Sequence, residues 1–353
     1  MLLKQITFHN FRNFEIESFT VNPFLTIVIG ENARGKTNLL EGIHVILQGE
    51  GFRESKEEEL IGLERNNGYV EGIFGEKNET FVYRVTLSKK KEAIEKLFFV
   101  NKTKKRHNQY LQEQIKAVLF SPEQIEIIIG SPGVRRGYFD KLFSFYDYEY
   151  KEKLDNYESA LRRRNKVLEK HYDENQLKEE LEFWNTYLAQ QAEYIYSRRK
   201  EYCMYLNKHP KLDSKEFFIE YLDNRFTEKR LCEYFNEEKR WRRTLIGPQK
   251  DDFQIYIKNQ SKVDRPLGEN IHHYGSRSEQ RMAVFWLKMN EIQYYEETKE
   301  KKPILLLDDI FSELDVHNKK IILDLIKKYQ TIVTTTEREV IELAEVPNTI
   351  INL

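Results

Sequence analysis

An eight-residue segment near the N-terminus has the residue types and the spacing of a phosphate-binding loop. It reads Gly30-Glu31-Asn32-Ala33-Arg34-Gly35-Lys36-Thr37, which is the pattern G-x-x-x-x-G-K-[ST]. Gly30 and Gly35 allow the backbone to turn tightly, so that its N–H groups converge on phosphate oxygens. Lys36 can then reach the terminal phosphates, and the Thr37 hydroxyl can ligate Mg²⁺. The segment therefore predicts a site for a nucleoside triphosphate and Mg²⁺.

A pair of adjacent carboxylates, Asp308 and Asp309, could supply the second half of such a site. They follow the apolar run Pro303-Ile304-Leu305-Leu306-Leu307. Consecutive apolar residues are typical of a central parallel strand, and ligand groups lie at the carboxyl ends of such strands. We expect Asp308 to hold Mg²⁺, directly or through water, and Asp309 to orient or deprotonate the attacking water. An acid after a strand is common, so this interpretation depends on the phosphate-loop motif upstream.

The flanking sequence predicts the elements that would position these groups. Residues 25–29 are apolar and predict a strand, and the spacing of Leu39, Leu40 and Ile43 predicts a helix directly after the loop. The two motifs lie near opposite ends of the chain, far beyond the roughly 30 residues of a compact strand–helix–strand unit. The nucleotide-binding domain is therefore expected to combine both ends of the chain. Residues 332–336 predict the next strand, at whose tip a polar side chain could contact the terminal phosphate.

The intervening sequence predicts a β-rich layer followed by a helical insertion. Residues 68–100 contain three strand-like segments separated by turns, which is typical of an antiparallel meander. Over residues 147–207, apolar residues recur at helical spacing with one polar interruption, which predicts a hairpin of two helices. We expect an α/β protein in which residues 1–120 and 244–353 form the head, a mixed sheet with an antiparallel β-layer. Residues 121–243 are expected to form a helical lid domain.

The composition is that of a globular chain and disfavours several other classes. The chain has 353 residues, enough for one large or two modest domains, and 40% of them are hydrophobic. No apolar run approaches the roughly 18 residues of a membrane span, and residues 1–11 lack the apolar core of a signal peptide. Cys203 and Cys232 form neither a disulfide framework nor a metal-ligand pattern. We therefore expect a cytoplasmic protein with reduced thiols and no membrane association.

Any nucleic-acid surface must come from local clusters, because the formal net charge is only −1. Basic residues gather at 89–91, 102–106, 162–164, 198–200 and 240–243. For any one cluster, a solvated surface is the more common explanation. We favour the cluster at 102–106 as a DNA contact, because it lies in a predicted polar loop and has the least structural reason to be basic. Its cations are Lys102, Lys104, Lys105 and Arg106.

Five segments together resemble the RecF family, the bacterial recombination-repair branch of the ABC/SMC ATPase superfamily. They are Asn10-Phe11-Arg12-Asn13-Phe14, the phosphate loop with Thr37-Asn38-Leu39-Leu40-Glu41, Gly247-Pro248-Gln249-Lys250-Asp251-Asp252, the loop around Ser276, and Leu305-Leu306-Leu307-Asp308-Asp309-Ile310-Phe311-Ser312-Glu313-Leu314-Asp315. The resemblance implies an ABC/SMC-type P-loop ATPase head with an inserted helical lid. It implies ATP as the nucleotide, bound by the loop from Gly30 to Asn38. It also implies a head-to-head dimer that forms on ATP, in which Ser276 and Asp315 contact the nucleotide of the other subunit.

The resemblance further implies a function in DNA replication and repair. Members of the family bind DNA at gaps and at junctions between single- and double-stranded DNA. They hydrolyse ATP weakly, with stimulation by DNA, and they act with RecR and RecO in loading RecA. DNA and these three proteins are therefore the expected partners.

Two departures from the family pattern bear on this expectation. Ala33 stands where a glycine is usual in the phosphate loop, although nucleotide binding should survive the extra Cβ. The segment from Ser276 to Gln280 differs from the pattern S-x-G-Q-Q at Ser278 and Glu279. Glu279 places an acid near the expected terminal phosphate, so the contact with the other subunit should weaken unless a nearby arginine offsets it.

Three other functions remain compatible with a phosphate-loop ATPase. A nucleotide-binding subunit of a membrane transporter is disfavoured by the long helical insertion and by the absence of the full Leu-Ser-Gly-Gly-Gln signature and of the H-loop histidine. A nuclease-associated ATPase of the overcoming-lysogeny type is disfavoured because no carboxylate- or histidine-rich cluster follows the ATPase motifs. A non-hydrolysing scaffold is disfavoured because Lys36, Thr37 and both aspartates are intact.

Overall fold

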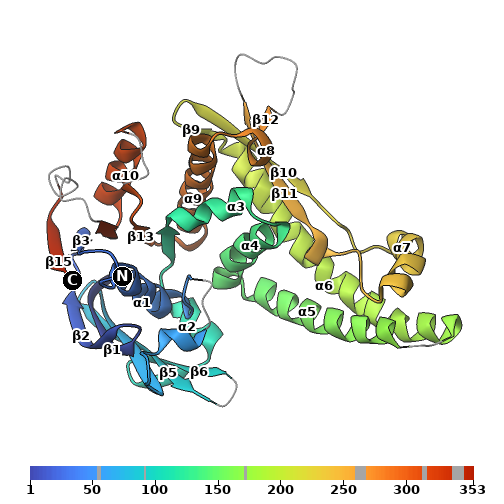
Figure 1. The fold of residues 1–353 in the computed structure, drawn as a ribbon, viewed down its shortest axis with the longest axis horizontal. Helices are drawn as coiled ribbons and strands as arrows, with labels where there is room; N and C mark the ends of the chain where they lie inside the picture. Colours follow the sequence, from blue (N-terminus) through green and yellow to red (C-terminus); the bar gives the residue numbers. More distant parts are fainter. Residues whose placement is uncertain (54–56, 91–92, 171–172, 259–267, 312–315, 336–345) are drawn as a thin grey trace. The chain divides into compact units, whose positions relative to one another are not determined.

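The chain forms two compact units in a computed structural model that describes residues 1–53, 57–90, 93–170, 173–258, 268–311, 316–335 and 346–353 (Figure 1). The first unit combines residues 1–123 with residues 291–353. The second unit consists of residues 124–290. Both the N-terminal and the C-terminal parts of the chain therefore contribute to the first unit.

The first unit contains a six-stranded antiparallel sheet with the strand order β2-β1-β4-β5-β6-β7. Its strands are β1 (Leu2–Phe11), β2 (Phe14–Thr20), β4 (Asn67–Glu76), β5 (Glu79–Lys89), β6 (Ile94–Val100) and β7 (Thr103–Lys105). Leu3, Ile6 and Phe8 of β1 are fully buried, because one face of this sheet packs on the core. The meander predicted over residues 68–100 is confirmed in β4, β5 and β6.

A second sheet in this unit has five parallel strands in the order β15-β3-β14-β13-β8. They are β3 (Leu25–Ile29), β8 (Ala117–Phe120), β13 (Ile304–Asp308), β14 (Thr331–Thr335) and β15 (Asn348–Asn352). β3, from the N-terminal part of the chain, lies between two strands from the C-terminal part. Because all strands run in one direction, their carboxyl ends meet at one edge.

Helix α1 (Lys36–Gln48) confirms the helix predicted after the loop and contacts strands of both sheets. Its buried residues Leu39, Leu40 and Ile43 belong to an apolar core that also includes residues of β1 and β14. Gly42 approaches Phe8 so closely that a Cβ would lie 2.1 Å from Phe8 Cε1. The helix can therefore pack at this distance from β1 only with glycine at this position. The other helices of the unit are η1 (Glu57–Leu60), α2 (His107–Glu113) and α10 (Val316–Lys328).

Gln330 links the two sheets through its buried side-chain amide. Its Oε1 accepts from the Leu3 N–H at 2.9 Å, and its Nε2 donates to the carbonyl oxygens of Leu3 at 2.7 Å and Asn22 at 2.9 Å. Leu3 lies beyond the last residue pair between β1 and β2, which is Gln5 with Thr20. A side chain that directly precedes β14 therefore satisfies buried backbone groups that strand β2 does not reach.

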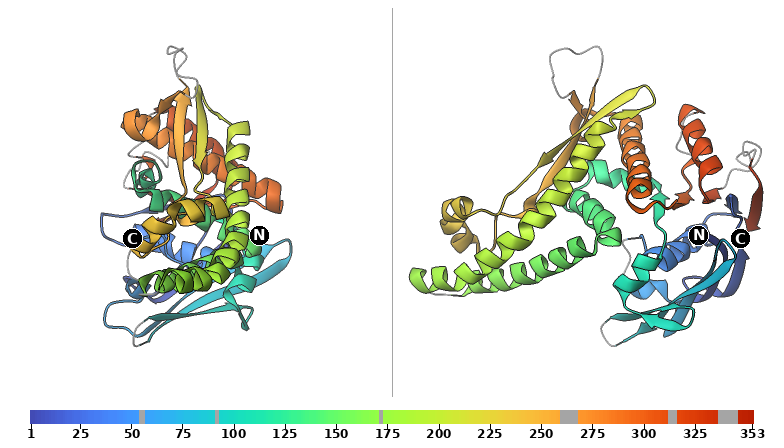
Figure 2. Two further views of the ribbon diagram at one scale, coloured as in Figure 1. Left: turned by 90° about the vertical axis from the view of Figure 1, so that its right-hand side faces the viewer. Right: turned by 180° about the vertical axis from the view of Figure 1, so that it is seen from behind.

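The second unit contains a long helical hairpin and a small antiparallel sheet (Figure 1, Figure 2). Helices α5 (Tyr148–Glu169) and α6 (Glu174–Lys208) lie side by side and confirm the predicted hairpin. The sheet has the order β12-β11-β10-β9, with β9 (Lys211–Leu212), β10 (Lys215–Leu222), β11 (Asp252–Lys258) and β12 (Glu269–Asn270). The remaining elements are η2 (Pro122–Ile125), α3 (Glu126–Ile129), α4 (Pro132–Tyr146), α7 (Glu228–Trp241), η3 (Pro248–Lys250), α8 (Ile271–Tyr274) and α9 (Arg277–Lys299). Of these, η2 begins in the first unit and α9 continues into it.

Two features differ from the expectations. Residues 244–290, which the sequence analysis assigns to the head, lie in the second unit, because β11 pairs with β10 along its whole length. The prediction of a polar loop at 102–106 is partly wrong, because residues 103–105 form β7, which pairs with β6. Within the described ranges, no helix is both long and apolar enough to cross a membrane.

We expect Gln330→Ala to lower the free energy of unfolding by about 2–4 kcal/mol, because buried backbone groups of Leu3 lose their partner. Urea denaturation measures this loss. The matched control is Gln293→Ala, an exposed glutamine whose amide bonds to Glu297, for which we expect a loss of less than about 0.5 kcal/mol. Equal unfolding midpoints for the two variants would contradict the linking role of Gln330.

Candidate functional site

The predicted phosphate-binding loop connects β3 to the first turn of α1. Its backbone is left-handed at Ala33 (φ 65°) and at Gly35 (φ 108°). A Cβ at Gly35 would lie 2.6 Å from Nδ2 of Asn13, so both the backbone conformation and the neighbouring side chain require glycine there. Ala33 adopts the conformation that glycine favours while its side chain is exposed, which explains why the loop accommodates the departure at this position.

Lys36 is the first residue of α1 and is buried. Its Nζ donates to the carbonyl oxygens of Gly30 at 2.6 Å and of Glu31 at 3.0 Å, so the ammonium lies within the curve of the loop. Arg34 and Glu31 form an exposed ion pair at 3.5 Å across the same loop. Asn32 is exposed.

Asp308 joins the two sequence motifs. Its Oδ1 accepts from Thr37 Oγ1 at 3.1 Å and from Thr334 Oγ1 at 2.7 Å. The strand order β3-β14-β13 produces this meeting, because Thr37 begins the helix after β3 while the other two residues lie in β13 and β14. Burial raises the pKa of Asp308, and the hydrogen bonds from Thr334 and Thr37 act in the opposite direction.

Asp309 follows in a left-handed backbone conformation, with φ 48°. Its N–H donates to Thr334 Oγ1 at 3.1 Å and lies 3.3 Å from the Thr334 carbonyl oxygen. Thr334 therefore holds the side chain of one acid and the backbone of the next. The sequence analysis missed Thr334, because only the register of β14 beside β13 reveals it. Thr336, at the predicted tip of that strand, lies outside the described residues.

The turn between β1 and β2 braces the phosphate loop. Asn13 Nδ2 donates to the Arg34 carbonyl oxygen at 3.1 Å, and Asn13 Oδ1 accepts from Asn38 Nδ2 at 2.6 Å. Arg12 donates to both carboxylate oxygens of the buried Glu41 of α1, at 2.8 and 3.0 Å. The sequence analysis did not select Asn13 or Arg12 as site residues. The signal was the segment from Asn10 to Phe14, which supported only the family resemblance.

The structure describes one of the two residues that are expected to contact the nucleotide of another subunit. Ser276 lies in the second unit, exposed, directly before α9. Its N–H and its Oγ each donate to Glu279 Oε2 at 2.8 Å, and the Glu279 N–H donates back to Ser276 Oγ at 3.3 Å. This reciprocal pair is a capping box, so Glu279 forms part of a helix cap. Asp315 lies outside the described residues.

The predicted DNA cluster lies at an edge of the antiparallel sheet, on and around β7. Lys102, Lys104 and Arg106 are exposed. Lys105 is half-buried, and its Nζ donates to Glu113 Oε1 of α2 at 2.7 Å. One of the four cations therefore has a structural partner within the unit.

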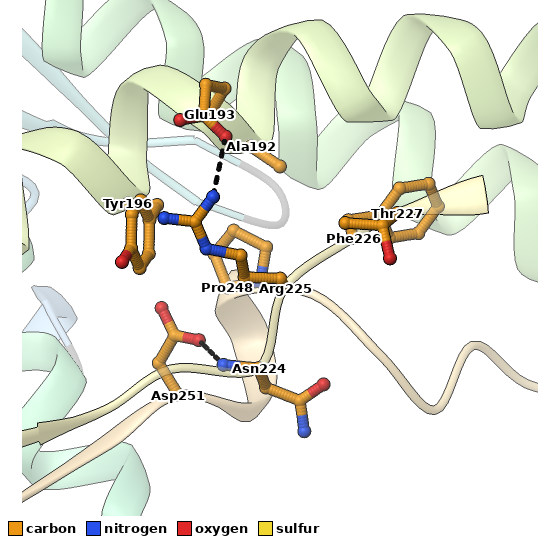
Figure 3. A pocket seen from close by; sticks show the side chains of 9 residues that line it. All are labelled: Ala192, Glu193, Tyr196, Asn224, Arg225, Phe226, Thr227, Pro248 and Asp251. Atoms are coloured by element: carbon orange, nitrogen blue, oxygen red, sulfur yellow. Dashed lines mark hydrogen bonds and ion pairs between the residues drawn. The ribbon is translucent and has the colours of Figure 1, made fainter. Parts of the chain in front are cut away.

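A pocket in the second unit lies between α6, the segment that precedes α7, and η3 (Figure 3). The guanidinium of Arg225 stacks 3.7 Å from the centre of the Tyr196 ring, and the Asn224 N–H donates to the buried Asp251 at 2.7 Å. No residue that the sequence analysis selected for nucleotide, metal or DNA lines this pocket. It is therefore separate from the predicted site.

The residues around Asp308 suit Mg²⁺ and a phosphate chain. Mg²⁺ prefers oxygen ligands and takes few of them from the protein, as Thr37 and Asp308 would supply. A divalent cation would also favour the ionised form of Asp308, which burial disfavours. The first-turn N–H groups of α1 and the tight loop before it suit an anion.

The fold and the site define a class of protein, a P-loop protein whose phosphate loop and acidic strand come from opposite ends of the chain. Residues 2–352 match the family described as the RecF/RecN/SMC N terminal domain. The Smc head domain of Pyrococcus furiosus has the same fold, with a TM-score of 0.51 at 18% identity over 97% of this chain and 91% of that one.

Relatives with higher sequence identity show which family within this class the chain resembles. The DNA replication and repair protein RecF of Thermoanaerobacter sp. (strain X514) is 32% identical over 362 residues, which cover 96% of this chain and 95% of that protein. A structure of the recombination mediator protein RecF with ATP, in the RecFOR pathway, has a TM-score of 0.84 at 29% identity and covers 98% of this chain and 93% of that one. The chain therefore belongs to the RecF family.

We expect Thr334→Val to lower the free energy of unfolding by about 1.5–3 kcal/mol, because the buried Asp308 carboxylate loses a hydroxyl donor while the side-chain volume is kept. The matched control is Thr331→Val at the other end of β14, whose buried hydroxyl donates to the neutral Tyr329 carbonyl oxygen at 3.0 Å. For this control we expect a loss of about 1 kcal/mol. Urea denaturation measures both variants, and a loss no greater in Thr334→Val than in the control would refute the special role of Thr334.

Proposed function

We propose that the chain binds ATP with Mg²⁺ through the loop from Gly30 to Asn38. The observation that carries this proposal is the hydrogen bond of 3.1 Å between Thr37 and Asp308, which are 271 positions apart in the chain. Bound ATP and Mg²⁺ would supply the phosphoanhydride bond and the cation that neutralises its oxygens. Thr37 and Asp308 would hold that cation through oxygen atoms, and the first-turn N–H groups of α1 would bind phosphate.

We propose a weak, DNA-stimulated ATPase activity. Lys36 would exchange its hydrogen bonds to the Gly30 and Glu31 carbonyl oxygens for bonds to the terminal phosphates. Asp309 would orient or deprotonate the attacking water. Thr334 supports this assignment, because it fixes the backbone of Asp309 beside the carboxylate of Asp308.

We propose that ATP drives head-to-head dimerisation and that the dimer binds DNA at gaps and single-strand–double-strand junctions. Ser276 and Asp315 of one subunit would contact the nucleotide of the other. Residues 102–106 are the proposed DNA contact. Lys105 is half-buried and bonded to Glu113, so the exposed Lys102, Lys104 and Arg106 are the more accessible cations.

Membership of the RecF family supports a role in recombinational repair in the cytoplasm. Relatives carry the name DNA replication and repair protein, and a solved relative is a recombination mediator of the RecFOR pathway. We propose that this chain acts with RecR and RecO and helps to load RecA.

Light scattering with and without ATP and Mg²⁺, followed by addition of gapped duplex DNA, tests the proposed function. A monomer that becomes a dimer only with ATP, and retains gapped DNA only then, is the expected result. A monomer that binds nucleotide throughout would contradict the dimer and favour a scaffold.

Substitution of the proposed catalytic residues separates binding from hydrolysis. Lys36→Arg is expected to abolish ATP-dependent dimerisation, because a planar guanidinium cannot replace the compact ammonium inside the loop. Asp309→Asn is expected to leave ATP binding intact, to trap the dimer and to slow hydrolysis by about 10²–10⁴-fold. Light scattering and phosphate release measure these effects, with the exposed Asp324→Asn of α10 as a control. Normal hydrolysis by Asp309→Asn would exclude it as the base.

Glu279→Gln is expected to tighten the ATP-dependent dimer severalfold. The glutamine oxygen can still accept from Ser276 and keep the capping box, while a negative charge near the phosphates of the other subunit is removed. The dimer dissociation constant is measured by light scattering at several protein concentrations. Glu297→Gln on the exposed face of the same helix is the control. An unchanged constant for Glu279→Gln would show that this carboxylate does not face the dimer contact.

A further inference from the structure

Five residues at the end of α7 form an exposed basic segment around a tryptophan, which we call the tryptophan segment. They are Lys239, Arg240, Trp241, Arg242 and Arg243. Trp241 is 58% exposed, although tryptophan side chains usually bury a large apolar surface. The guanidinium carbons of Arg240 and Arg243 lie 6.0 and 5.7 Å from the centre of its ring. The segment therefore combines an accessible aromatic surface with closely placed cations.

A single buried arginine of α5 holds the segment at both ends. Arg164 donates to Glu238 Oε2 at 2.7 Å and to Thr244 Oγ1 at 2.8 Å. Glu238 directly precedes the tryptophan segment and Thr244 directly follows it, and all three anchoring side chains are buried. Burying this ion pair costs desolvation energy, which its electrostatic attraction and hydrogen bonds must offset. Its effect is to fix where the exposed residues between the two anchors lie.

The backbone conformation at the end of α7 sets the course of the segment, and the helical hairpin carries a second arginine–aromatic pair. Arg242 adopts a left-handed conformation with φ 51° and ends α7, which reverses the chain toward Thr244. Arg163 directly precedes the anchoring arginine on α5 and is exposed. The Arg163 guanidinium lies 5.7 Å from the centre of the Trp184 ring of α6, which forms a second arginine–aromatic pair on the helical hairpin.

We propose that the tryptophan segment binds single-stranded nucleic acid. Trp241 stacks on an unpaired base, and the arginines contact the phosphates on either side. Bases inside a duplex are already stacked on each other, so an exposed ring flanked by cations selects the single strand. The inference rests on the proposed DNA-binding function and adds a contact in the second unit to the cluster at 102–106.

Charge favours nucleic acid over a protein as the occupant of this surface. Four of the five residues of the tryptophan segment are cations, and none is an acid. The adjacent acid, Glu238, is paired with Arg164, and Lys239, the first residue of the segment, forms an ion pair with Glu174 at 3.4 Å. The cores of protein interfaces are depleted in charged residues, whereas single-strand surfaces combine aromatic rings with a basic groove.

The test is binding of a fluorescein-labelled oligodeoxythymidylate to the full-length protein, with ATP and Mg²⁺, at several salt concentrations. Trp241→Ala is expected to weaken binding about tenfold, and Trp241→Phe, which keeps an aromatic ring, to restore most of it. Arg240→Ala with Arg243→Ala is expected to reduce the slope of log affinity against log salt by about 1.4, for two phosphate contacts on a single strand. The controls are Lys229→Ala, 86% exposed on the same helix, and Met204→Ala, 54% exposed on α6.

Each outcome separates this inference from the proposed function. The wild-type protein could bind DNA while the variants keep its single-strand affinity and its salt slope. That result would overturn the inference and leave the proposed function intact. Wild-type protein that binds ATP but neither single-stranded nor gapped DNA would overturn both. Variants that bind the oligonucleotide normally but lose binding to purified RecR would show that the surface is a protein interface and would also overturn the inference.

Discussion

The candidate site in the first unit depends on one buried carboxylate, that of Asp308. An isolated carboxylate in an apolar interior would be strongly disfavoured, and burial accordingly raises the pKa of this group. Hydroxyl groups from two neighbouring elements, Thr37 of α1 and Thr334 of β14, compensate by donating to the same oxygen. This arrangement exists only when β3, β14 and β13 lie in the observed order. The candidate site therefore cannot form before strands from both ends of the chain have paired.

Residues outside the phosphate loop hold its backbone and the helix that follows it. Asn13 donates to the loop carbonyl of Arg34 and accepts from Asn38 of α1, while Arg12 pairs with the buried Glu41. Both bracing residues belong to the turn between β1 and β2 of the antiparallel sheet, and α1 contacts strands of this sheet and of the parallel sheet. A loop whose conformation is set in advance loses less conformational freedom when it binds a ligand. The antiparallel layer thus contributes to the site without supplying a group that would touch phosphate.

The parts of this architecture that could be predicted from sequence are those encoded locally. The phosphate loop has a fixed spacing, and the apolar run before Asp308 identifies its strand without reference to any other residue. Thr334 and Gln330 could not be predicted, because their roles depend on which strands become neighbours. The same limit explains the domain boundary: β11 has an ordinary strand pattern, and only its pairing with β10 assigns it to the second unit. Asn13 belongs to a sequence motif that supported the family resemblance, but that motif did not reveal its hydrogen bonds to the phosphate loop and to α1.

Basic clusters show why charge counted along a sequence is a poor guide to a nucleic-acid surface. Arg199 belongs to such a cluster, yet it is buried and bonds to Asp140 and Asp251. Burial alone would lower the pKa of Arg199, but Tyr150 and these two acids raise it, so the guanidinium is firmly a structural cation. Arg164 is likewise buried and forms an ion pair with the buried Glu238. Acids that neutralise interior arginines cannot neutralise exposed ones, so a chain with a net charge of −1 can still present a surface of concentrated positive charge.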